Sequence, residues 1–254
     1  MAGLIKTPDE VKKIRLAGRI LAKVLNELSL AAEEGVTLKD LDGLAFGLIK
    51  KAGAKPAFFG YRPSGAGKPF PATLCASLND VVVHGIPSKR RLKSGDLLKL
   101  DLGVLLDDYY ADAAITIGIG KISPVGERLI AAAKGALESA IEAVKPGNTL
   151  GDIGNAVHRF VGRHGFKAVK GLTGHGIGSN LHEEPDVLNY GEPGRGRVLK
   201  TGMVLAIEPM ISAGSELVKR LSDDSYATVD GSLSSHFEHT VAVAEKGMEV
   251  LTML

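Results

Sequence analysis

The stretch GVTLKD at residues 35–40 decides how this chain folds, because GNTLGD repeats its pattern 112 positions later, at residues 147–152. In each copy an aspartate stands three residues after a threonine. That spacing is the signature of a helix N-terminus at which both side chains cap the first turn. Each copy reaches a glycine suited to a helix end 18 residues after its first residue, at Gly53 and Gly165. The repeat therefore predicts two equivalent helices.

A second pair of matching segments delivers an acid in each half of the chain. LKSG begins nine residues before Asp101, and LKTG begins nine residues before Glu208. Both acids follow apolar runs that read as β-strands. Halves that each supply a capped helix and a strand leading to a carboxylate are typical of two similar α+β units that face each other.

Two further helices precede the repeated ones. Thr7, with proline next and glutamate three residues on, caps the first, and Ser123, also followed by proline, opens the other. We therefore expect an α+β fold built as one domain over residues 1–254, with halves over about 7–120 and 121–254.

Composition sets the background for the site. The 254 residues are 44% hydrophobic, which suits a domain with a buried core, and the net charge of +2 gives no indication of nucleic-acid binding. A single cysteine, Cys75, excludes an intrachain disulfide and a thiolate-rich zinc site. No stretch is long enough for a membrane span and the start has no apolar signal core, so we expect a cytoplasmic protein without membrane contact.

Four carboxylates and one histidine stand beside apolar runs or tight turns: Asp101, Asp112, His175, Glu208 and Glu238. Asp101 closes the apolar run 97–100, Glu208 closes the run 203–207, and Glu238 lies within 236–243; all three runs read as strands. Alternation along a strand points Asp101 away from the packed leucines beside it, toward a cleft. An ionised carboxylate beside a core strand is costly unless a cation compensates it. Two divalent ions would balance four carboxylates.

The motifs together resemble those of type I methionine aminopeptidases. They are NDVVVHGIP (79–87), Asp101 and Asp112 eleven apart, GHGIG (174–178), HEEP (182–185), IEPM (207–210) and EHT (238–240). The resemblance runs from about Thr7 to the C-terminus in the order and spacing of that family. It implies the pita-bread (creatinase/aminopeptidase) fold, an α+β fold with pseudo-twofold related halves, and a site for two divalent metal ions.

The resemblance also implies a role for each ligand. Asp112 and Glu238 would bridge the two ions, His175 and Glu208 would bind one of them, and Asp101 would chelate the other. Glu208 would in addition accept a proton during the reaction. Paired divalent ions activate a water for attack on the first peptide carbonyl. Carboxylates with one imidazole accept cobalt, manganese, iron or zinc, so the residues leave the identity of the metal open.

Two histidines and three pocket residues complete the implied site. His84 and His182 resemble histidines that hydrogen-bond the scissile amide and stabilise charge in the transition state. Phe70, Cys75 and Leu181 are expected to line the pocket for the substrate side chain, together with the two histidines.

Several departures from the family pattern concern this pocket. Relatives often place a tryptophan over it in the stretch that matches residues 221–226, whereas this chain has none. A wider pocket that admits first residues other than methionine is therefore a hypothesis. His236 replaces a common glutamine, and by alternation it shares a strand face with Glu238. We expect it to stand behind the ligands and to affect metal affinity or preference.

The function implied by the resemblance is removal of the initiator methionine from nascent proteins when the second residue is small, by a protein that is commonly a monomer. Its partners would be the N-termini of nascent polypeptides. Ribosome contact stays open, because the basic cluster at residues 89–93 reads first as a solvated turn. Two rival hypotheses are a proline-directed peptidase of the same fold and a non-catalytic binding protein. The segment GAGK at 65–68 is not taken as a phosphate loop, because a proline follows it.

Overall fold

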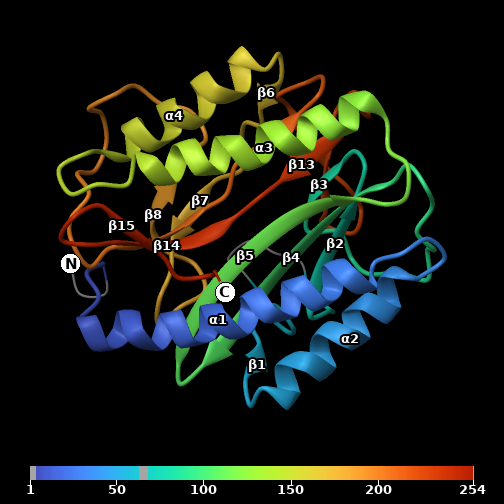
Figure 1. Cartoon of the computed structure of the whole chain (residues 1–254), viewed down its shortest axis with the longest axis horizontal. Helices are drawn as coiled ribbons and strands as arrows, with labels where there is room; N and C mark the ends of the chain where they lie inside the picture. Colours follow the sequence, from blue (N-terminus) through green and yellow to red (C-terminus); the bar gives the residue numbers. More distant parts are fainter. Residues whose placement is uncertain (1–3, 63–67, 254) are drawn as a thin grey trace.

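The computed structural model describes residues 4–62 and 68–253 (Figure 1). The glycines of the rejected phosphate-loop segment, at 65 and 67, lie outside the described residues. Four helices are present in the described part: α1 (Pro8–Ala31), α2 (Leu38–Lys51), α3 (Pro124–Glu142) and α4 (Leu150–Arg163). Among these helices, none is both long and apolar enough to span a membrane.

The helices begin where the capping residues predict. The carboxylate of Asp40 accepts the backbone N–H of Thr37 at 3.2 Å, and that of Asp152 accepts the backbone N–H of Thr149 at 2.7 Å. Each pair forms a capping box, which satisfies N–H groups that the first helical turn leaves without partners. The four predicted helices are therefore confirmed at their starts.

The two repeats also make matching contacts. The N–H of Gly35 donates to the carbonyl of Leu92 at 2.9 Å, and the N–H of Gly147 donates to the carbonyl of Leu199 at 3.0 Å. In each half the segment before the capped helix is thus tied to the start of the repeated LKSG or LKTG motif. These matched hydrogen bonds support the predicted division into two halves, which stays a prediction.

Within the described residues, the strands form four sheets. The first has the order β1-β4-β2 with β5 paired to β4, and the second has the order β15-β14-β9-β7-β8. Two three-stranded sheets have the orders β13-β10-β6 and β11-β12-β3. The bounds are β1 Lys55–Pro56, β2 Leu74–Leu78, β3 Val81–Val83, β4 Leu97–Leu106, β5 Tyr109–Gly118, β6 Lys167–Ala168, β7 Gly174–Gly176, β8 Glu183–Val187, β9 Val204–Ile207, β10 Met210–Ser212, β11 Val218–Arg220, β12 Tyr226–Thr228, β13 Ser234–His236, β14 His239–Val243 and β15 Met248–Val250.

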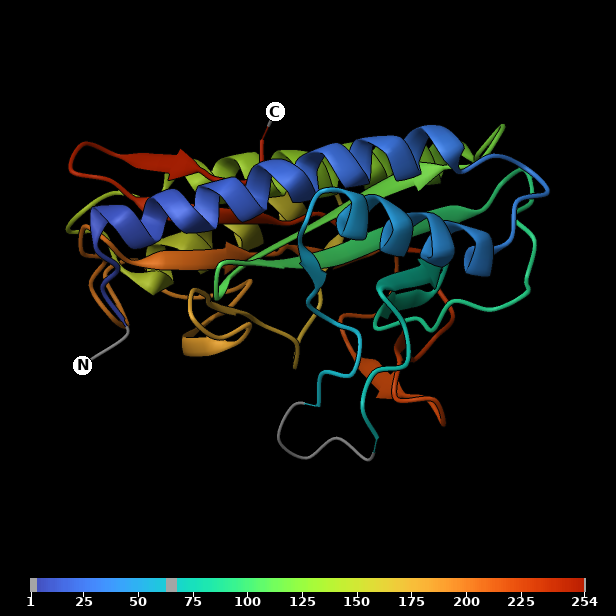
Figure 2. The same cartoon turned by 90° about the horizontal axis from the view of Figure 1, so that it is seen from below.

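Each helix pair covers its own sheet. Buried side chains of α1 and α2 form one apolar cluster with β2, β4 and β5, while α3 and α4 form another with β9 and β14. Figure 2 shows the helices on one side of the strands, with the orange segment around 218–228 projecting on the other. The first and second sheets meet where β5 lies against β14. The carboxylates are found at this junction.

Candidate metal centre

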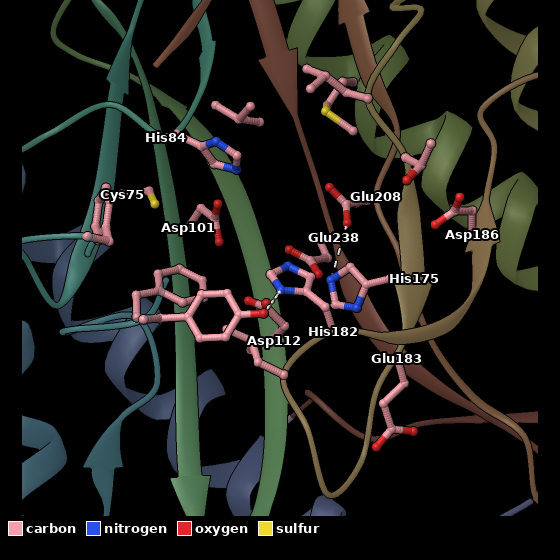
Figure 3. Close-up of a pocket in the computed structure, with 18 of the residues that line it drawn as sticks. Cys75, His84, Asp101, Asp112, His175, His182, Glu183, Asp186, Glu208 and Glu238 are labelled. Atoms are coloured by element: carbon pink, nitrogen blue, oxygen red, sulfur yellow. Dashed lines mark hydrogen bonds and ion pairs between the residues drawn. The ribbon is translucent and has the colours of Figure 1, made fainter. Parts of the chain in front are cut away.

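A cavity of about 690 Å³ opens beside β4, β5 and β7, and every site residue predicted from the sequence lines it (Figure 3). Those residues are His84, Asp101, Asp112, His175, His182, Glu208, Glu238, Phe70, Cys75 and Leu181. The volume lies in the range of sites that hold small molecules or the end of a peptide. Residues from strands far apart in sequence therefore converge on one pocket.

Asp101 and Asp112 point to the same face of the first sheet. Asp101 pairs with Ala114 across β4 and β5, and Asp112 precedes Ala114 by two residues on the same strand. Cross-strand partners and residues two apart share a face, so both carboxylates project into the cavity. The pairing of β4 with β5 continues past Asp101 to Leu106, so Asp101 lies inside the strand.

Glu238 lies at a break between two strands. The sequence predicted one strand over residues 236–243, but the chain leaves β13 after His236 and enters β14 at His239. β13 pairs with β10 whereas β14 pairs with β9, so the chain changes sheets at this point. The N–H of Glu238 donates to the carbonyl of Ala114 at 2.9 Å. This bond holds the carboxylate of Glu238 over the face that carries the two aspartates.

His175 and Glu208 come from the sheet of the other half. His175 on β7 pairs with Ala206 on β9, and Glu208 follows two residues later. The Nδ1 of His175 lies 2.8 Å from the carbonyl of Gly176, so Nδ1 carries the proton and donates it. Its Nε2 then keeps a free lone pair, 3.6 Å from Glu208 Oε1. This arrangement orients imidazoles that ligate metals.

The glycines around His175 allow strands to approach closely. A Cβ on Gly174 would meet the carbonyl oxygen of Ala206 at 2.3 Å, and one on Gly176 would meet that of Glu184 at 2.2 Å. The neighbouring strands β9 and β8 thus leave no room for a side chain at either position.

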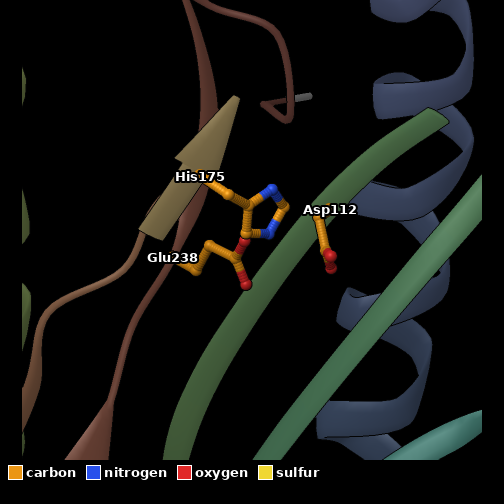
Figure 4. A group of neighbouring side chains, drawn as sticks. All are labelled: Asp112, His175 and Glu238. Carbon is orange, nitrogen blue, oxygen red and sulfur yellow. The ribbon is translucent and has the colours of Figure 1, made fainter. Parts of the chain in front are cut away.

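Three of the predicted ligands form a compact donor set. One ligand atom each of Asp112, His175 and Glu238 lies within 4.8 Å of the others (Figure 4). Within the described residues, one buried oxygen each of Asp101, Asp112 and Glu238 has no hydrogen-bond partner. Buried carboxylate oxygens without partners are costly, and hard or borderline divalent cations bind such oxygens together with imidazole. The donor set fits a divalent metal.

The electrostatics of the carboxylates support this fit. Burial raises the pKa of Asp101 to about 7. Burial and then the charges of the neighbouring carboxylates raise the pKa values of Asp112, Glu208 and Glu238 well above their ordinary values. Burial lowers the pKa of His175 and of His236 to about 3, so neither imidazole supplies positive charge at neutral pH. A bound cation would restore the ionised form of the four acids.

Lys99 does not neutralise these acids. Its ammonium is buried and donates to the carbonyl oxygens of Asn79 and Ser234, at 2.7 Å and 3.3 Å, and to the Ser234 hydroxyl at 3.1 Å. Its hydrogen bonds to Ser234 instead tie β4 to β13.

His84 and His182 line the cavity beside the donor set. His84 has a φ of 61°, a left-handed conformation that is uncommon for a residue other than glycine and that concentrates at functional sites. The ring of His182 lies 4.3 Å from that of His175, and its Nδ1 lies 2.6 Å from the hydroxyl of Tyr61. Burial lowers the pKa of both histidines, that of His84 to about 4, so both rings are neutral at neutral pH.

Comparison with known proteins identifies the family. Residues 12–245 match the model of metallopeptidase family M24. The chain belongs to family M24. It is 45% identical to a methionine aminopeptidase of Clostridium acetobutylicum over 98% of both chains. It is also 44% identical to a methionine aminopeptidase of Aquifex aeolicus over 100% of both chains.

Solved structures of the family share the fold of this M24 chain. A methionine aminopeptidase from Thermotoga maritima matches 98% of the chain with a TM-score of 0.94 and 40% identity, and the match covers 99% of that structure. A prolidase from Pyrococcus horikoshii matches with a TM-score of 0.79 and 26% identity, and only 63% of that longer chain is covered. These likenesses confirm the predicted pita-bread fold, the methionine aminopeptidase family and the enzyme class of a metallo-aminopeptidase.

The pocket of this M24 enzyme has walls that the sequence did not indicate. Phe58, Tyr61, Val83 and Met210 line the cavity beside the predicted residues. Phe58 and Tyr61 lie in a loop without an ordered pattern, so nothing in their spacing predicts contact with the site. The rings of Tyr226 and His84 pack edge-on, with their centroids 5.8 Å apart. Tyr226 lies in the stretch where relatives often place a tryptophan. An aromatic residue of that stretch thus contacts a catalytic candidate.

Proposed function

We propose that this protein removes the initiator methionine from nascent polypeptides when the second residue is small, with divalent metal ions as cofactors. The observation that carries the proposal is the convergence of three buried carboxylates, a fourth that is partly buried (Glu208) and one neutral histidine in one pocket, with three carboxylate oxygens lacking partners among the described residues. The methionine aminopeptidases among its M24 relatives support the substrate class.

The proposed metal site holds two divalent ions, drawn from cobalt, manganese, iron and zinc. Asp112 and Glu238 would bridge them, His175 and Glu208 would bind one ion, and Asp101 would chelate the other. When bound, the ions supply Lewis-acid activation of a water and of the scissile carbonyl. The close grouping of Asp112, His175 and Glu238 supports the central part of this assignment.

Side chains of the protein would accept the proton and hydrogen-bond the substrate amide. Glu208 is the proposed proton acceptor, placed at the wall of the pocket opposite Asp101 (Figure 3). The hydroxyl of Tyr61 is able to donate to Nδ1 of His182, which leaves the proton of that neutral ring on Nε2. A neutral histidine with Nε2–H is suited to donate to the carbonyl oxygen of the substrate as charge develops there. His84 would contact the same amide from the other side.

Apolar and sulfur-containing side chains would bind the methionine side chain. Cys75, Phe70 and Leu181 form the predicted part of that pocket, and Phe58 lies edge-to-face with Phe70 at 6.3 Å. Burial and the nearby carboxylates raise the pKa of the Cys75 thiol well above its ordinary value, so the thiol serves as a neutral wall. Methionine suits such a pocket, because its flexible thioether packs well against aromatic rings.

The remaining proposals concern the setting of the reaction. We infer one catalytic domain over residues 1–254 with two related halves, acting as a monomer in the cytoplasm on the N-termini of nascent chains. Bacterial relatives of nearly the same length support this setting. Contact with the ribosome stays an open proposal. Arg90 and Arg91 of the basic cluster are engaged locally, with Asp96 and with the carbonyl of Gly35.

A panel of peptides tests the proposed specificity. The metal-loaded protein should release the first residue from Met-Ala-Ser much faster than from Leu-Ala-Ser, and faster from Met-Ala-Ser than from Met-Leu-Ser. Equal release of leucine would replace the methionine specificity by a broad one, in agreement with a wider pocket. Cleavage of Met-Pro dipeptides in preference to all of these peptides would favour the alternative hypothesis of a proline-directed peptidase. A prolidase shares the fold of this chain.

A further inference from the structure

His236 is a buried histidine that the proposed reaction leaves without a role. Its residue is 1% exposed. The backbone N–H of His236 donates to the hydroxyl of Thr116 at 2.9 Å, and the backbone carbonyl of His236 accepts the proton of the same hydroxyl at 2.7 Å. Both bonds fix the backbone of β13 to β5, four residues beyond Asp112. The ring of His236 is therefore held beside the metal centre by its backbone.

The ring itself has no hydrogen-bond partner. Within residues 4–62 and 68–253, neither Nδ1 nor Nε2 of His236 forms a hydrogen bond. Buried polar groups in folded proteins are almost always paired, so an unpaired imidazole in the interior needs an explanation. One carboxylate is close: Nε2 of His236 lies 3.6 Å from Oε2 of Glu208. That separation exceeds an ordinary N–H···O bond by roughly half an ångström, which a small side-chain rotation closes.

Glu208 thus lies between two imidazoles that contact different oxygens. Its Oε1 is 3.6 Å from Nε2 of His175, and its Oε2 is 3.6 Å from Nε2 of His236. The Nδ1–H of His175 is used by a backbone carbonyl, so the Nε2 of that ring offers only a lone pair to whatever faces it. His236 has no such constraint among the described residues, and its neutral ring is free to carry its proton on Nε2. The two oxygens of Glu208 are therefore in unlike surroundings.

We propose that His236 is a positioning residue for Glu208: its Nε2–H donates to Oε2 and thereby directs Oε1, together with His175, toward a bound metal ion. This inference rests on the metal-dependent function proposed above. Hydrogen bonds behind a ligand fix its orientation, and their loss typically lowers metal affinity about 10- to 100-fold. His236 acts through Glu208 and is itself outside the compact group formed by Asp112, His175 and Glu238.

Two variants of His236 test the hydrogen bond directly. His236→Leu has a similar volume and no donor, whereas His236→Gln keeps an N–H at a comparable reach. His158→Leu, at an exposed position of α4, is the matched control for a histidine-to-leucine change. Cobalt(II) is titrated into each metal-stripped protein by calorimetry, and the visible absorption spectrum of the bound ion is recorded. Release of methionine from Met-Ala-Ser gives kcat and KM.

The proposal predicts that His236→Leu binds at least one cobalt ion about 10- to 100-fold more weakly, with an altered spectrum and a lower kcat at nearly unchanged KM. His236→Gln should restore affinity and spectrum to within a few-fold of the wild type, and His158→Leu should match the wild type. Cobalt binding and spectrum unchanged in His236→Leu would overturn the proposal, and so would equal losses in the leucine and glutamine variants. A wild-type protein that binds no cobalt and releases no methionine would instead overturn the proposed function.

A measurement on the wild-type protein keeps the test independent of how the variants fold. Nitrogen-15 NMR of the histidine rings distinguishes the two neutral tautomers, and comparison with His236→Gln assigns the signals of His236. In the cobalt-free, zinc-loaded protein, the Nε2–H tautomer is expected. An Nδ1–H tautomer, or direct coordination of zinc by His236, would overturn the proposed hydrogen bond to Glu208.

Discussion

His182 shows how a single side chain is prepared for its role by one neighbour. Its Nδ1 is engaged by the Tyr61 hydroxyl at 2.6 Å, and its ring packs beside that of His175. Burial lowers its pKa, which keeps the ring neutral at the pH where the enzyme would work. In the proposed tautomer, with Tyr61 as donor, the Nε2–H of His182 would be available to the substrate amide, and the ring would add no positive charge beside the proposed metal ligands.

Replacement of His182 by alanine should therefore lower kcat far more than it changes KM. A donor that acts mainly in the transition state is worth roughly 10²- to 10³-fold in kcat. Steady-state kinetics of methionine release from Met-Ala-Ser by the metal-loaded His182→Ala variant check this, with His158→Ala as an exposed control. A variant whose kcat stays within a few-fold of the wild type would remove His182 from the catalytic group.

At the residue scale, the sequence predicts the properties that depend only on neighbours along the chain. Alternation along the strand predicted that Asp101 faces a cleft, because that property depends only on neighbours in the strand. Tyr61 was missed, because its role depends on a loop and on His182, 121 residues away. The ion pair between Glu183, which lines the cavity, and the buried Lys6 ammonium was likewise missed, because the two residues lie far apart in sequence.

At the scale of elements, the helix starts were predictable to the residue. Thr37 with Asp40 and Thr149 with Asp152 form capping boxes, and both signals lie within four consecutive residues. The break between β13 and β14 was not predictable, because the run from His236 to Val243 is continuously strand-like in sequence. It breaks because its two parts pair with different strands, β10 and β9, which is a tertiary effect.

The two capping threonines should contribute unequally to stability. Thr37→Ala should lower the free energy of unfolding by about 1 kcal/mol, because the Thr37 hydroxyl accepts the first-turn N–H of Asp40 at 3.1 Å. Thr149→Ala should lower it less, because the Thr149 hydroxyl only donates to the Asp152 carboxylate at 2.8 Å. For a chain of this length, the loss in Thr37→Ala corresponds to a fall in melting temperature of about 2–4 °C. Thermal unfolding followed by circular dichroism measures it, with Thr201→Ala, exposed and outside any helix, as control. No shift in either cap variant would show that the first turns do not depend on these hydroxyls.

At the scale of the whole molecule, the two halves bring together acids that repel one another. The metal-free protein contains three buried carboxylates and the partly buried Glu208, and the pKa values of all four are raised, first by desolvation. When these carboxylates are ionised, the repulsion between them lowers the stability of the folded metal-free protein. A divalent cation would convert that repulsion into attraction, because metals bind the ionised carboxylates of the folded state.

The raised pKa of Asp101 predicts a pH dependence of the metal-free protein. The folded chain holds this proton up to about pH 7, while the unfolded chain releases it near 3.8, so the contribution of protonated Asp101 to stability is complete at low pH and is lost as the pH rises through 7. Metal-free Asp101→Asn, which cannot ionise, should therefore gain stability over the metal-free wild type at about pH 8 and gain much less at about pH 5.

Chemical denaturation of both metal-free proteins at the two pH values measures this difference. Saturating manganese should reverse the order at the higher pH, since the wild type then gains the stabilisation of an ion that the variant binds less well. A difference between the proteins that does not change with pH would mean that Asp101 is ionised in the folded state at both values.

Release of methionine from Met-Ala-Ser by the metal-stripped protein, before and after addition of manganese, iron(II), cobalt or zinc, tests the central claim most directly. Asp112→Asn is the control, because it removes one carboxylate from the compact group with His175 and Glu238 while preserving side-chain volume. The account predicts no release of methionine without metal and release after addition of at least one of the metals. It also predicts that the rate of release falls more than about 100-fold in Asp112→Asn, which exceeds the loss caused by removing a hydrogen-bond partner of a ligand. Release by the stripped protein, or full activity of Asp112→Asn, would contradict it.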